Sequence, residues 1–190
     1  SNKKTKVIIP VHMMGVSAKM HEIMKIAKKY KLKVLEDNCE SMGSKYNKKY
    51  LCNIGDAGVV SFDFGKTITC GEGGMILTKN KSIDKFSREY HDHGHELNPK
   101  YPRGLDTKTI TGFNYRMTEM QAAVGKIQLK KLDTVIRESK KRYLAIYKKI
   151  FKNKELEFRE IPKNSEQIYD TLIFFVKNKT LRGKIIQVLN

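Results

Sequence analysis

The first forty residues place one amphipathic helix pattern between two short apolar runs. Residues 6–12 (KVIIPVH) predict a buried strand that ends in a turn at Gly15, and residues 33–37 (KVLED) predict a second strand. Between them, Ser17 is placed to cap a helix. The apolar residues of that helix recur at helical spacing: Met20, Ile23, Met24 and Ala27. Strand, helix and strand with short links form a βαβ unit, which requires parallel strands in one sheet.

Two more apolar runs extend this sheet. Residues 59–64 (VVSFDF) predict a third strand and residues 74–78 (GMILT) a fourth, and a helix is expected from about Ser82 to His91. The expected fold class is therefore α/β, with a mostly parallel sheet covered by helices.

The second half of the chain has a different pattern. Thr118 is placed to cap a long helix that runs towards residue 150, with a bend near Asp133. Residues 156–161 (LEFREI) and 168–176 (IYDTLIFFV) then predict two strands, and a final helix starts near Thr180. We expect residues 1–130 to form part of a large domain, and residues 131–190 to form a connecting helix and the beginning of a small C-terminal domain. The chain opens inside a sheet unit and closes on an unpartnered helix, as expected of an excerpt from a longer protein.

Composition limits the partners. The 38 Lys and Arg against 20 Asp and Glu give a net charge of +18, which makes acidic partners plausible. The lysines are spread along the chain without a recognisable nucleic-acid-binding module, so no specific nucleic-acid role is expected. No apolar run approaches the ~20 residues that span a bilayer. Cys39, Cys52 and Cys70 lack C-x-x-C spacing and are expected to be reduced thiols in the cytoplasm.

Three polar residues lie at or just beyond the ends of predicted strands. Asp37 ends the second strand, Ser61 lies in the third, and Lys66 follows five residues later. Ligands bind at such strand ends in open parallel sheets. Each residue also has a purely structural alternative: Asp37 caps a turn, Ser61 satisfies a backbone group, and Lys66 extends to solvent.

Together the three residues suit pyridoxal 5′-phosphate (PLP). A lysine in mostly apolar surroundings has its charged form disfavoured, and its amine can attack the aldehyde of the cofactor. An aspartate on a neighbouring strand can keep the pyridine nitrogen protonated. A serine hydroxyl and glycine-flanked amides can receive the phosphate.

Three segments also resemble a known family. EDNCESMGSKY, GDAGVVSFDFGKTITCGEGGMILT and GFNYRMTEMQAAVGKIQLKKLD are similar to successive signatures of the DegT/DnrJ/EryC1/StrS sugar aminotransferases, which are fold-type I PLP enzymes. The resemblance covers residues 6–145 in unbroken order. It implies the large domain of a PLP-dependent transferase, followed by a long helix and the start of a small α+β C-terminal domain.

The resemblance implies a role for each matching residue. Lys66 is the expected Schiff-base lysine and proton shuttle, and Asp37 is the expected partner of the pyridine nitrogen. Glu40 falls near the 3-hydroxyl of the cofactor, and Ser61 is expected to bind its phosphate. Asn114 is expected to reach the phosphate in the neighbouring subunit of a homodimer.

The implied reaction is transfer of an amino group, with glutamate as the expected donor, to a keto-sugar. The substrate is either nucleotide-linked or an 8-oxo-octulosonate, in surface polysaccharide or amino-sugar biosynthesis. Asp63 stands where many members have histidine, which affects contacts to the substrate or donor. Members are also about twice as long, and the missing N-terminal part is expected to supply a phosphate contact and a stacking aromatic residue.

Other readings remain open. A non-catalytic member with a basic surface could bind anions or nucleic acid, but such a protein has no chemical need for both Lys66 and Asp37. In a related dehydratase subclass, histidine replaces the lysine. A metal site at His91, His93 and His95 is disfavoured because the segment is predicted to be a loop without a carboxylate cluster. The resemblance instead makes His93 part of a substrate-side loop.

Overall fold

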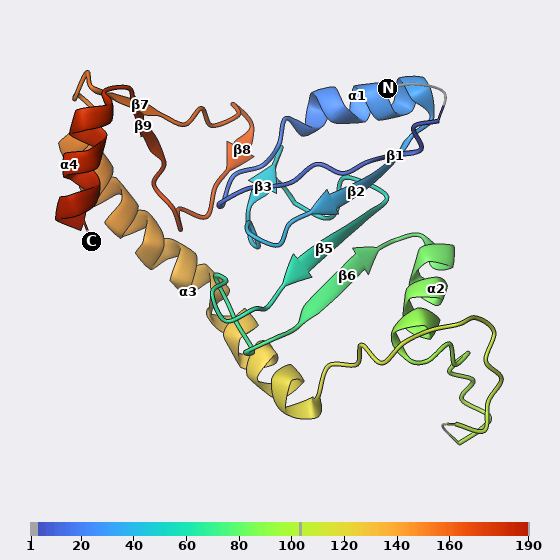
Figure 1. Ribbon diagram of the computed structural model, residues 1–190. Coiled ribbons are helices and arrows are strands. Elements are labelled where there is room, and N and C mark those ends of the chain that lie inside the picture. Colours follow the sequence, from blue (N-terminus) through green and yellow to red (C-terminus); the bar gives the residue numbers. More distant parts are fainter. Residues whose placement is uncertain (1–3, 103, 190) are drawn as a thin grey trace.

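The computed structural model describes residues 4–102 and 104–189, and its elements are drawn in Figure 1. Along the chain they are β1 (Val7–Ile8), α1 (Met20–Tyr30), β2 (Lys33–Asp37), β3 (Lys45–Tyr46), β4 (Lys49–Tyr50), β5 (Ala57–Ser61), β6 (Gly74–Thr78), α2 (Lys81–His91), α3 (Glu119–Ile150), β7 (Leu156–Phe158), β8 (Ser165–Glu166), β9 (Phe174–Val176) and α4 (Lys179–Leu189).

The main sheet has the order β1-β2-β5-β6. Strands β1, β2 and β5 are parallel, whereas β6 runs antiparallel to β5 with Ser61 opposite Gly74. Helix α1 connects the parallel strands β1 and β2, so the predicted βαβ unit and the mostly parallel α/β fold are confirmed.

The first strand is shorter and more exposed than residues 6–12 predicted. Only Val7–Ile8 form β1, followed by an isolated bridge between Val11 and Asp37. Pro10 lies between these pairings and has no N–H to donate to the ladder. Val7 and Val11 are each 46% exposed, so the prediction of a buried strand was wrong.

Helix α1 forms where its apolar spacing predicted, but Ser17 does not cap it. The helix begins at Met20, and the preceding Lys19 makes no side-chain capping bond. Ser17 is instead buried, and its hydroxyl has no hydrogen-bond partner among the described residues. The helix ends at Tyr30, and the left-handed backbone of the next residue, Lys31, lets its N–H bond the carbonyls of the last turn.

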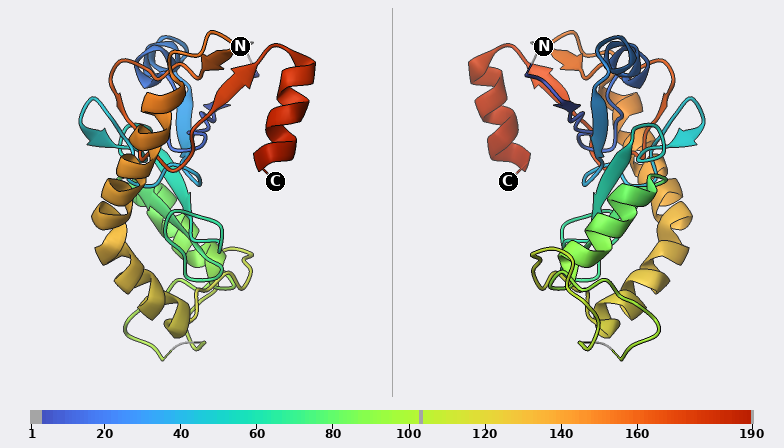
Figure 2. Two further views of the ribbon diagram at one scale, coloured as in Figure 1. Left: turned by 90° about the vertical axis from the view of Figure 1, so that its left-hand side faces the viewer. Right: turned by 90° about the vertical axis from the view of Figure 1, so that its right-hand side faces the viewer.

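Helices α2 and α3 begin at side-chain caps. Asn80 accepts hydrogen bonds from the backbone N–H groups of Ser82 and Ile83 at the start of α2. Thr118 forms a capping box with Gln121 at the start of α3, as predicted for Thr118. Helix α3 then continues without interruption for 32 residues and runs along one side of the molecule (Figure 2).

After α3 the chain builds two small sheets. Strands β7 and β9 pair with each other, whereas β8 pairs with β3 of the N-terminal half. The strands are shorter than residues 156–161 and 168–176 predicted. Tyr169 has a φ of 62°, a left-handed conformation that interrupts the second extended run. Helix α4 then packs beside β9, close to the predicted start at Thr180.

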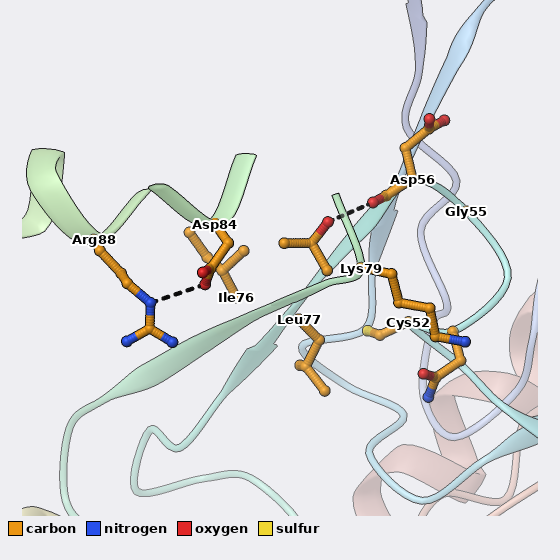
Figure 3. A pocket seen from close by; sticks show the side chains of 10 residues that line it. Cys52, Gly55, Asp56, Ile76, Leu77, Lys79, Asp84 and Arg88 are labelled. Carbon is orange, nitrogen blue, oxygen red and sulfur yellow. Dashed lines mark hydrogen bonds and ion pairs between the residues drawn. The ribbon is translucent and has the colours of Figure 1, made fainter. Parts of the chain in front are cut away.

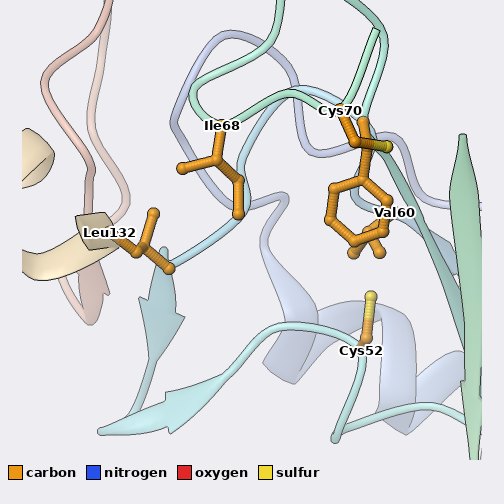
Figure 4. Packing of buried hydrophobic residues seen from close by; sticks show 6 residues of the cluster. Cys52, Val60, Ile68, Cys70 and Leu132 are labelled. Atoms are coloured by element: carbon orange, nitrogen blue, oxygen red, sulfur yellow. The ribbon is translucent and has the colours of Figure 1, made fainter. Parts of the chain in front are cut away.

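Two hydrophobic clusters hold these layers together. One lies under α1 and contains Met20, Ala27, Val34, Tyr46 and Leu51. The other joins the sheet to α3 and contains Cys52, Val60, Phe62, Ile68, Cys70 and Leu132 (Figure 4). The second cluster fixes both sides of the loop between β5 and β6, which carries Lys66. Among the described residues, no helix is both long and apolar enough to cross a membrane.

Candidate active site

Strand β2 is anchored by a polar group that has no contact with solvent. Glu36 and His12 are both 0% exposed, and His12 Nε2 lies 3.1 Å from Glu36 Oε2. Glu36 also accepts hydrogen bonds from the backbone N–H groups of Cys52, Ile54 and Gly55, at 2.7–2.9 Å. Four donors therefore satisfy this carboxylate and tie β2 to the segment before β5.

The protonation of this pair follows from its contacts. The backbone N–H of Ala18 donates to His12 Nδ1 at 3.0 Å, so the ring proton is on Nε2 and points at Glu36. Burial opposes the charge of Glu36, but the bonds from His12 and the three backbone N–H groups outweigh it and lower the pKa of Glu36.

Asp37 is the next residue of the strand and has quite different surroundings. It is half-buried at the carboxyl end of β2, and its Oδ1 accepts the backbone N–H of Cys39 at 3.1 Å. Burial and the negative charge of Asp37 raise the pKa of the Cys39 thiol to about 11, while the positive charge of Lys66 acts in the opposite direction. Asp37 ends β2 and Lys66 follows β5, the parallel strand paired with β2, so the two residues lie at the same end of the sheet.

Lys66 lies in the loop after β5 and faces a carboxylate. Its Nζ is 3.6 Å from Glu40 Oε1, and 25% of its side chain is exposed. The other oxygen of Glu40 accepts the backbone N–H of Met14 at 3.3 Å. The prediction of mostly apolar surroundings was wrong, because the turn after β2 folds back and brings Glu40 to the amine.

These groups line a pocket of about 170 Å³. Its walls come from four parts of the chain that lie far apart in sequence: Met14, Glu40, Gly65, Lys66, Thr67, Asp170 and Thr171. The pocket lies at the carboxyl ends of the parallel strands, where open α/β sheets bind ligands.

Asp170 reaches the pocket because the C-terminal segment packs onto the turn at Gly15. Ile168 is 1% exposed, and its backbone N–H donates to the Gly15 carbonyl at 3.2 Å. Gly15 has a φ of +77°, and a Cβ at this position would collide with the Asp170 carboxylate. Asp170 is exposed by surface area, but its carboxylate is crowded on the pocket side. This desolvation and the charge of Glu40 raise the pKa of Asp170.

Ser61 and Asp63 shape the loop that carries Lys66. The backbone N–H of Asp63 donates to Ser61 Oγ at 3.2 Å, and that of Gly65 donates to Asp63 Oδ2 at 3.1 Å. The N–H of Lys66 then bonds the carbonyl of Asp63 at 3.1 Å. Asp63 therefore closes a tight turn that sets the position of Lys66.

Asn114 does not line the pocket of its own chain. It is exposed in the segment between α2 and α3, where it forms an isolated bridge with Asp92. Arg116 forms an ion pair with Asp92 and helps to hold this segment. Of the five predicted site residues, Lys66 and Glu40 line the pocket, Asp37 and Ser61 lie at the adjacent strand ends, and Asn114 is elsewhere.

The histidine-rich segment forms a folded loop. His95 is buried and bonds Asp106 at 2.8 Å, His91 bonds the carbonyl of Arg88, and His93 is exposed. Within the described ranges, no group of three or more His, Cys, Asp or Glu residues is arranged to hold a metal ion.

A larger pocket of about 290 Å³ lies at the opposite end of β5 (Figure 3). Three of its four charged side chains form ion pairs: Arg88 with Asp84 at 3.0 Å, and Asp56 with Lys33 at 2.7 Å. Asp56 precedes β5, so this pocket is at the amino end of the parallel strands. Its position and its paired charges favour a structural role.

Comparison with known proteins identifies the family. A model described as the DegT/DnrJ/EryC1/StrS aminotransferase family matches residues 2–190. The chain belongs to this family. The resemblance predicted from three segments is confirmed, and the match extends beyond residue 145 to include the segment that carries Asp170.

Among curated members of the DegT/DnrJ/EryC1/StrS family, GDP-perosamine synthase of Escherichia coli O157:H7 is 37% identical over 169 residues, covering 88% of this chain and 43% of that protein. The UDP-4-amino-4,6-dideoxy-N-acetyl-beta-L-altrosamine transaminase of Helicobacter pylori is 33% identical over 152 residues, covering 80% and 40%. The chain thus spans less than half the length of these two relatives.

Solved structures of aminotransferases and related enzymes share the fold. Helicobacter pylori PseC, an aminotransferase involved in the biosynthesis of pseudoaminic acid, has a TM-score of 0.90 at 25% identity, covering 100% of this chain and 51% of that one. GDP-4-keto-6-deoxy-D-mannose-3-dehydratase of E. coli, solved with bound hydrated PLP, has a TM-score of 0.83 at 28% identity, covering 100% and 52%. The α/β transferase fold predicted from the sequence is therefore confirmed.

Sequence reasoning missed the two residues that the C-terminal segment contributes to this pocket. Asp170 and Thr171 are more than 100 residues from Lys66 in a segment predicted to be a continuous strand. Their arrival depends on the contact between Ile168 and Gly15, which no local pattern reveals. Sequence reasoning also assigned no site role to Cys39. Its position in EDNCES, between the predicted site residues Asp37 and Glu40, was the signal that placed it near the site.

Proposed function

We propose that the protein containing this chain is a PLP-dependent aminotransferase that moves an amino group from glutamate to a keto-sugar. The substrate is nucleotide-linked or an 8-oxo-octulosonate, and the product enters amino-sugar or surface polysaccharide biosynthesis in the cytoplasm. The observation that carries the proposal is the Lys66 amine in a pocket at the carboxyl ends of the parallel strands, with the Asp37 carboxylate at the end of the neighbouring strand β2.

The residues present fit PLP in their chemistry. PLP supplies an aldehyde to which an amine can attach and a protonated ring that stabilises negative charge on a substrate carbon. Lys66 provides the only amine among the residues that line the pocket. Asp37 provides a carboxylate at the neighbouring strand end, suited to hold a proton on the pyridine nitrogen.

Each side chain has a defined task in this proposal. The Lys66 amine holds the cofactor and carries a proton from the substrate carbon that bears the amino group. Glu40, 3.6 Å from that amine, orients it and would lie near the 3-hydroxyl of the bound cofactor. Ser61 Oγ, at the end of β5, donates to the phosphate. Asn114, which lies outside the pocket of its own chain, serves the neighbouring subunit of a homodimer.

The test uses the full-length protein mixed with PLP. We expect a visible absorption band from the bound cofactor, and reduction with borohydride should fix the cofactor on the peptide that contains Lys66. Lys66→Ala should abolish both signals. Lys45→Ala is the matched control, because Lys45 is also partly buried and forms an ion pair, with Glu166 at 3.9 Å.

Attachment of the cofactor to another lysine, with activity intact in Lys66→Ala, would refute the assignment. Salt-sensitive binding of nucleic acid without a bound chromophore would instead favour a non-catalytic, anion-binding protein. Amino transfer from glutamate to GDP-4-keto-6-deoxymannose, followed by chromatography of the sugar product, would narrow the substrate.

A further inference from the structure

The pocket around Lys66 has an acidic wall, although the chain as a whole carries a charge of +18. Glu40 and Asp170 each contribute a carboxylate, and Lys66 is the only basic residue among those that line the pocket. Glu40 is occupied by Lys66 and by the backbone N–H of Met14. Asp170 lies on the C-terminal segment and raises the question of what it binds.

Its position is fixed by packing, so the carboxylate is not a mobile surface group. Ile168, two residues earlier, is buried against the turn at Gly15. Tyr169 stacks edge-on against Tyr143 of α3, with ring centroids 5.3 Å apart. The chain on the N-terminal side of Asp170 is therefore held by both the sheet and α3, and Asp170 and Thr171 both line the pocket.

The chemistry of an ionised carboxylate selects among the reactants. It accepts hydrogen bonds and donates none, so it suits hydroxyl groups and repels other carboxylates. Glutamate carries two carboxylates at neutral pH, whereas a sugar presents several hydroxyl groups. The Asp170 side of the pocket therefore suits the sugar and not the carboxylates of the amino-acid donor.

We propose that Asp170 is a specificity-determining residue that accepts hydrogen bonds from hydroxyl groups of the sugar substrate. This inference rests on the proposed aminotransferase function and assigns one wall of its pocket to the sugar. Thr171, the adjacent lining residue, offers a hydroxyl group to the same ligand.

The test separates binding of the sugar from binding of the donor. Full-length protein is loaded with PLP and reduced with borohydride, so that it binds without turnover. It is then titrated calorimetrically with two amino sugars, GDP-perosamine and UDP-4-amino-4,6-dideoxy-N-acetyl-β-L-altrosamine. Glutamate binding is measured separately on unreduced protein. The quantity recorded is the glutamate concentration that gives half of the maximal change in the absorption spectrum of the cofactor.

For the sugar that wild type binds more tightly, Asp170→Ala should raise the dissociation constant roughly 10- to 100-fold, the range for a hydrogen bond to a charged group. Asp170→Asn keeps one acceptor oxygen, so its dissociation constant for the sugar should lie between those of Asp170→Ala and wild type. The half-saturating glutamate concentration should stay within about twofold. Glu166→Ala, on the same segment but outside the pocket, is the matched control and should change neither value.

Unchanged sugar binding in Asp170→Ala overturns the inference while leaving the proposed function intact. So does an equal weakening for sugar and glutamate, which indicates a general disturbance of the pocket, or a weakening for glutamate alone. If wild type forms no adduct at Lys66, the proposed function itself fails and this inference fails with it. If wild type forms the adduct but binds neither sugar, the inference fails for these two nucleotide-linked sugars.

Discussion

Glu36 and Asp37 are adjacent carboxylates on one strand, and the structure treats them in opposite ways. Successive side chains of a strand point to opposite faces of the sheet. Glu36 points into the interior, is 0% exposed and is surrounded by four hydrogen-bond donors. Asp37 is half-buried, and its Oδ1 accepts one backbone hydrogen bond, from the Cys39 N–H at 3.1 Å.

The difference separates a structural from a functional carboxylate. A carboxylate with all its acceptor positions filled has no capacity left for a ligand, but it stabilises the loops that donate to it. A carboxylate with open positions at a strand end contributes less to the fold and is available to a cofactor or substrate. Asp37 and Asp170 belong to the second kind, and Glu36 belongs to the first.

The largest expected effect is on stability, from Glu36→Ala. This change leaves three backbone N–H groups and the His12 ring N–H buried without acceptors. It should lower the free energy of unfolding by roughly 3–5 kcal/mol, the range for breaking a buried pair. The measurement is urea unfolding followed by circular dichroism.

The control is Glu157→Ala, which removes an exposed carboxylate that pairs with Lys177 at 3.2 Å. That change should cost no more than about 1 kcal/mol. Similar losses for the two variants would mean that the bonds around Glu36 do not stabilise the fold.

The next effect, from Asp37→Asn, is expected on catalysis and not on stability. The amide keeps an oxygen to accept the Cys39 N–H, so the free energy of unfolding should change by less than about 1 kcal/mol. The turnover number of the full-length enzyme should nevertheless fall at least about 100-fold, which is the lower end of the range for the contribution of a positioned acid or base to catalysis. Steady-state kinetics and urea unfolding of the same preparation measure both. A variant that is active but unstable would reverse the roles assigned to Glu36 and Asp37.

The sequence predicted the parallel sheet because apolar runs and helical spacing are local patterns. It pointed to Asp37, Ser61 and Lys66 through their positions at predicted strand ends, and to Glu40 through the resemblance of contiguous segments. It could not distinguish Glu36 from Asp37 by residue type, since the distinction comes from the donors of residues 52–55. Asp170 was missed for a similar reason: the contact that brings it to the pocket joins residues 15 and 168. Contacts of this range depend on the completed fold.

Even the cap of α1 shows how tertiary contacts override a local signal. Ser17 has a residue type favoured at helix starts, but its backbone N–H bonds Ser165 Oγ at 3.4 Å and the residue is buried. The segment is held by the C-terminal half, and the helix begins three residues later. The domain boundary near residue 130 stays a prediction, because α3 passes through it as a continuous helix.

The smallest expected effect is a change in how stability depends on pH. The pKa of Glu36 is lower in the folded protein than its ordinary value of 4.5, so the folded state binds this proton less readily than the unfolded state. Its contribution is fully present above pH 4.5 and is lost as the pH falls through the lower, folded-state pKa. Glu36→Gln should remove this part, so the free energy of unfolding should fall less steeply below pH 4.5 in Glu36→Gln than in wild type. The free energy of unfolding of both proteins is measured by urea unfolding between pH 3 and 7. Parallel curves would show that Glu36 has the same proton affinity in the folded and unfolded states. The four hydrogen-bond donors around Glu36 would then not distinguish its carboxylate from that of Asp37.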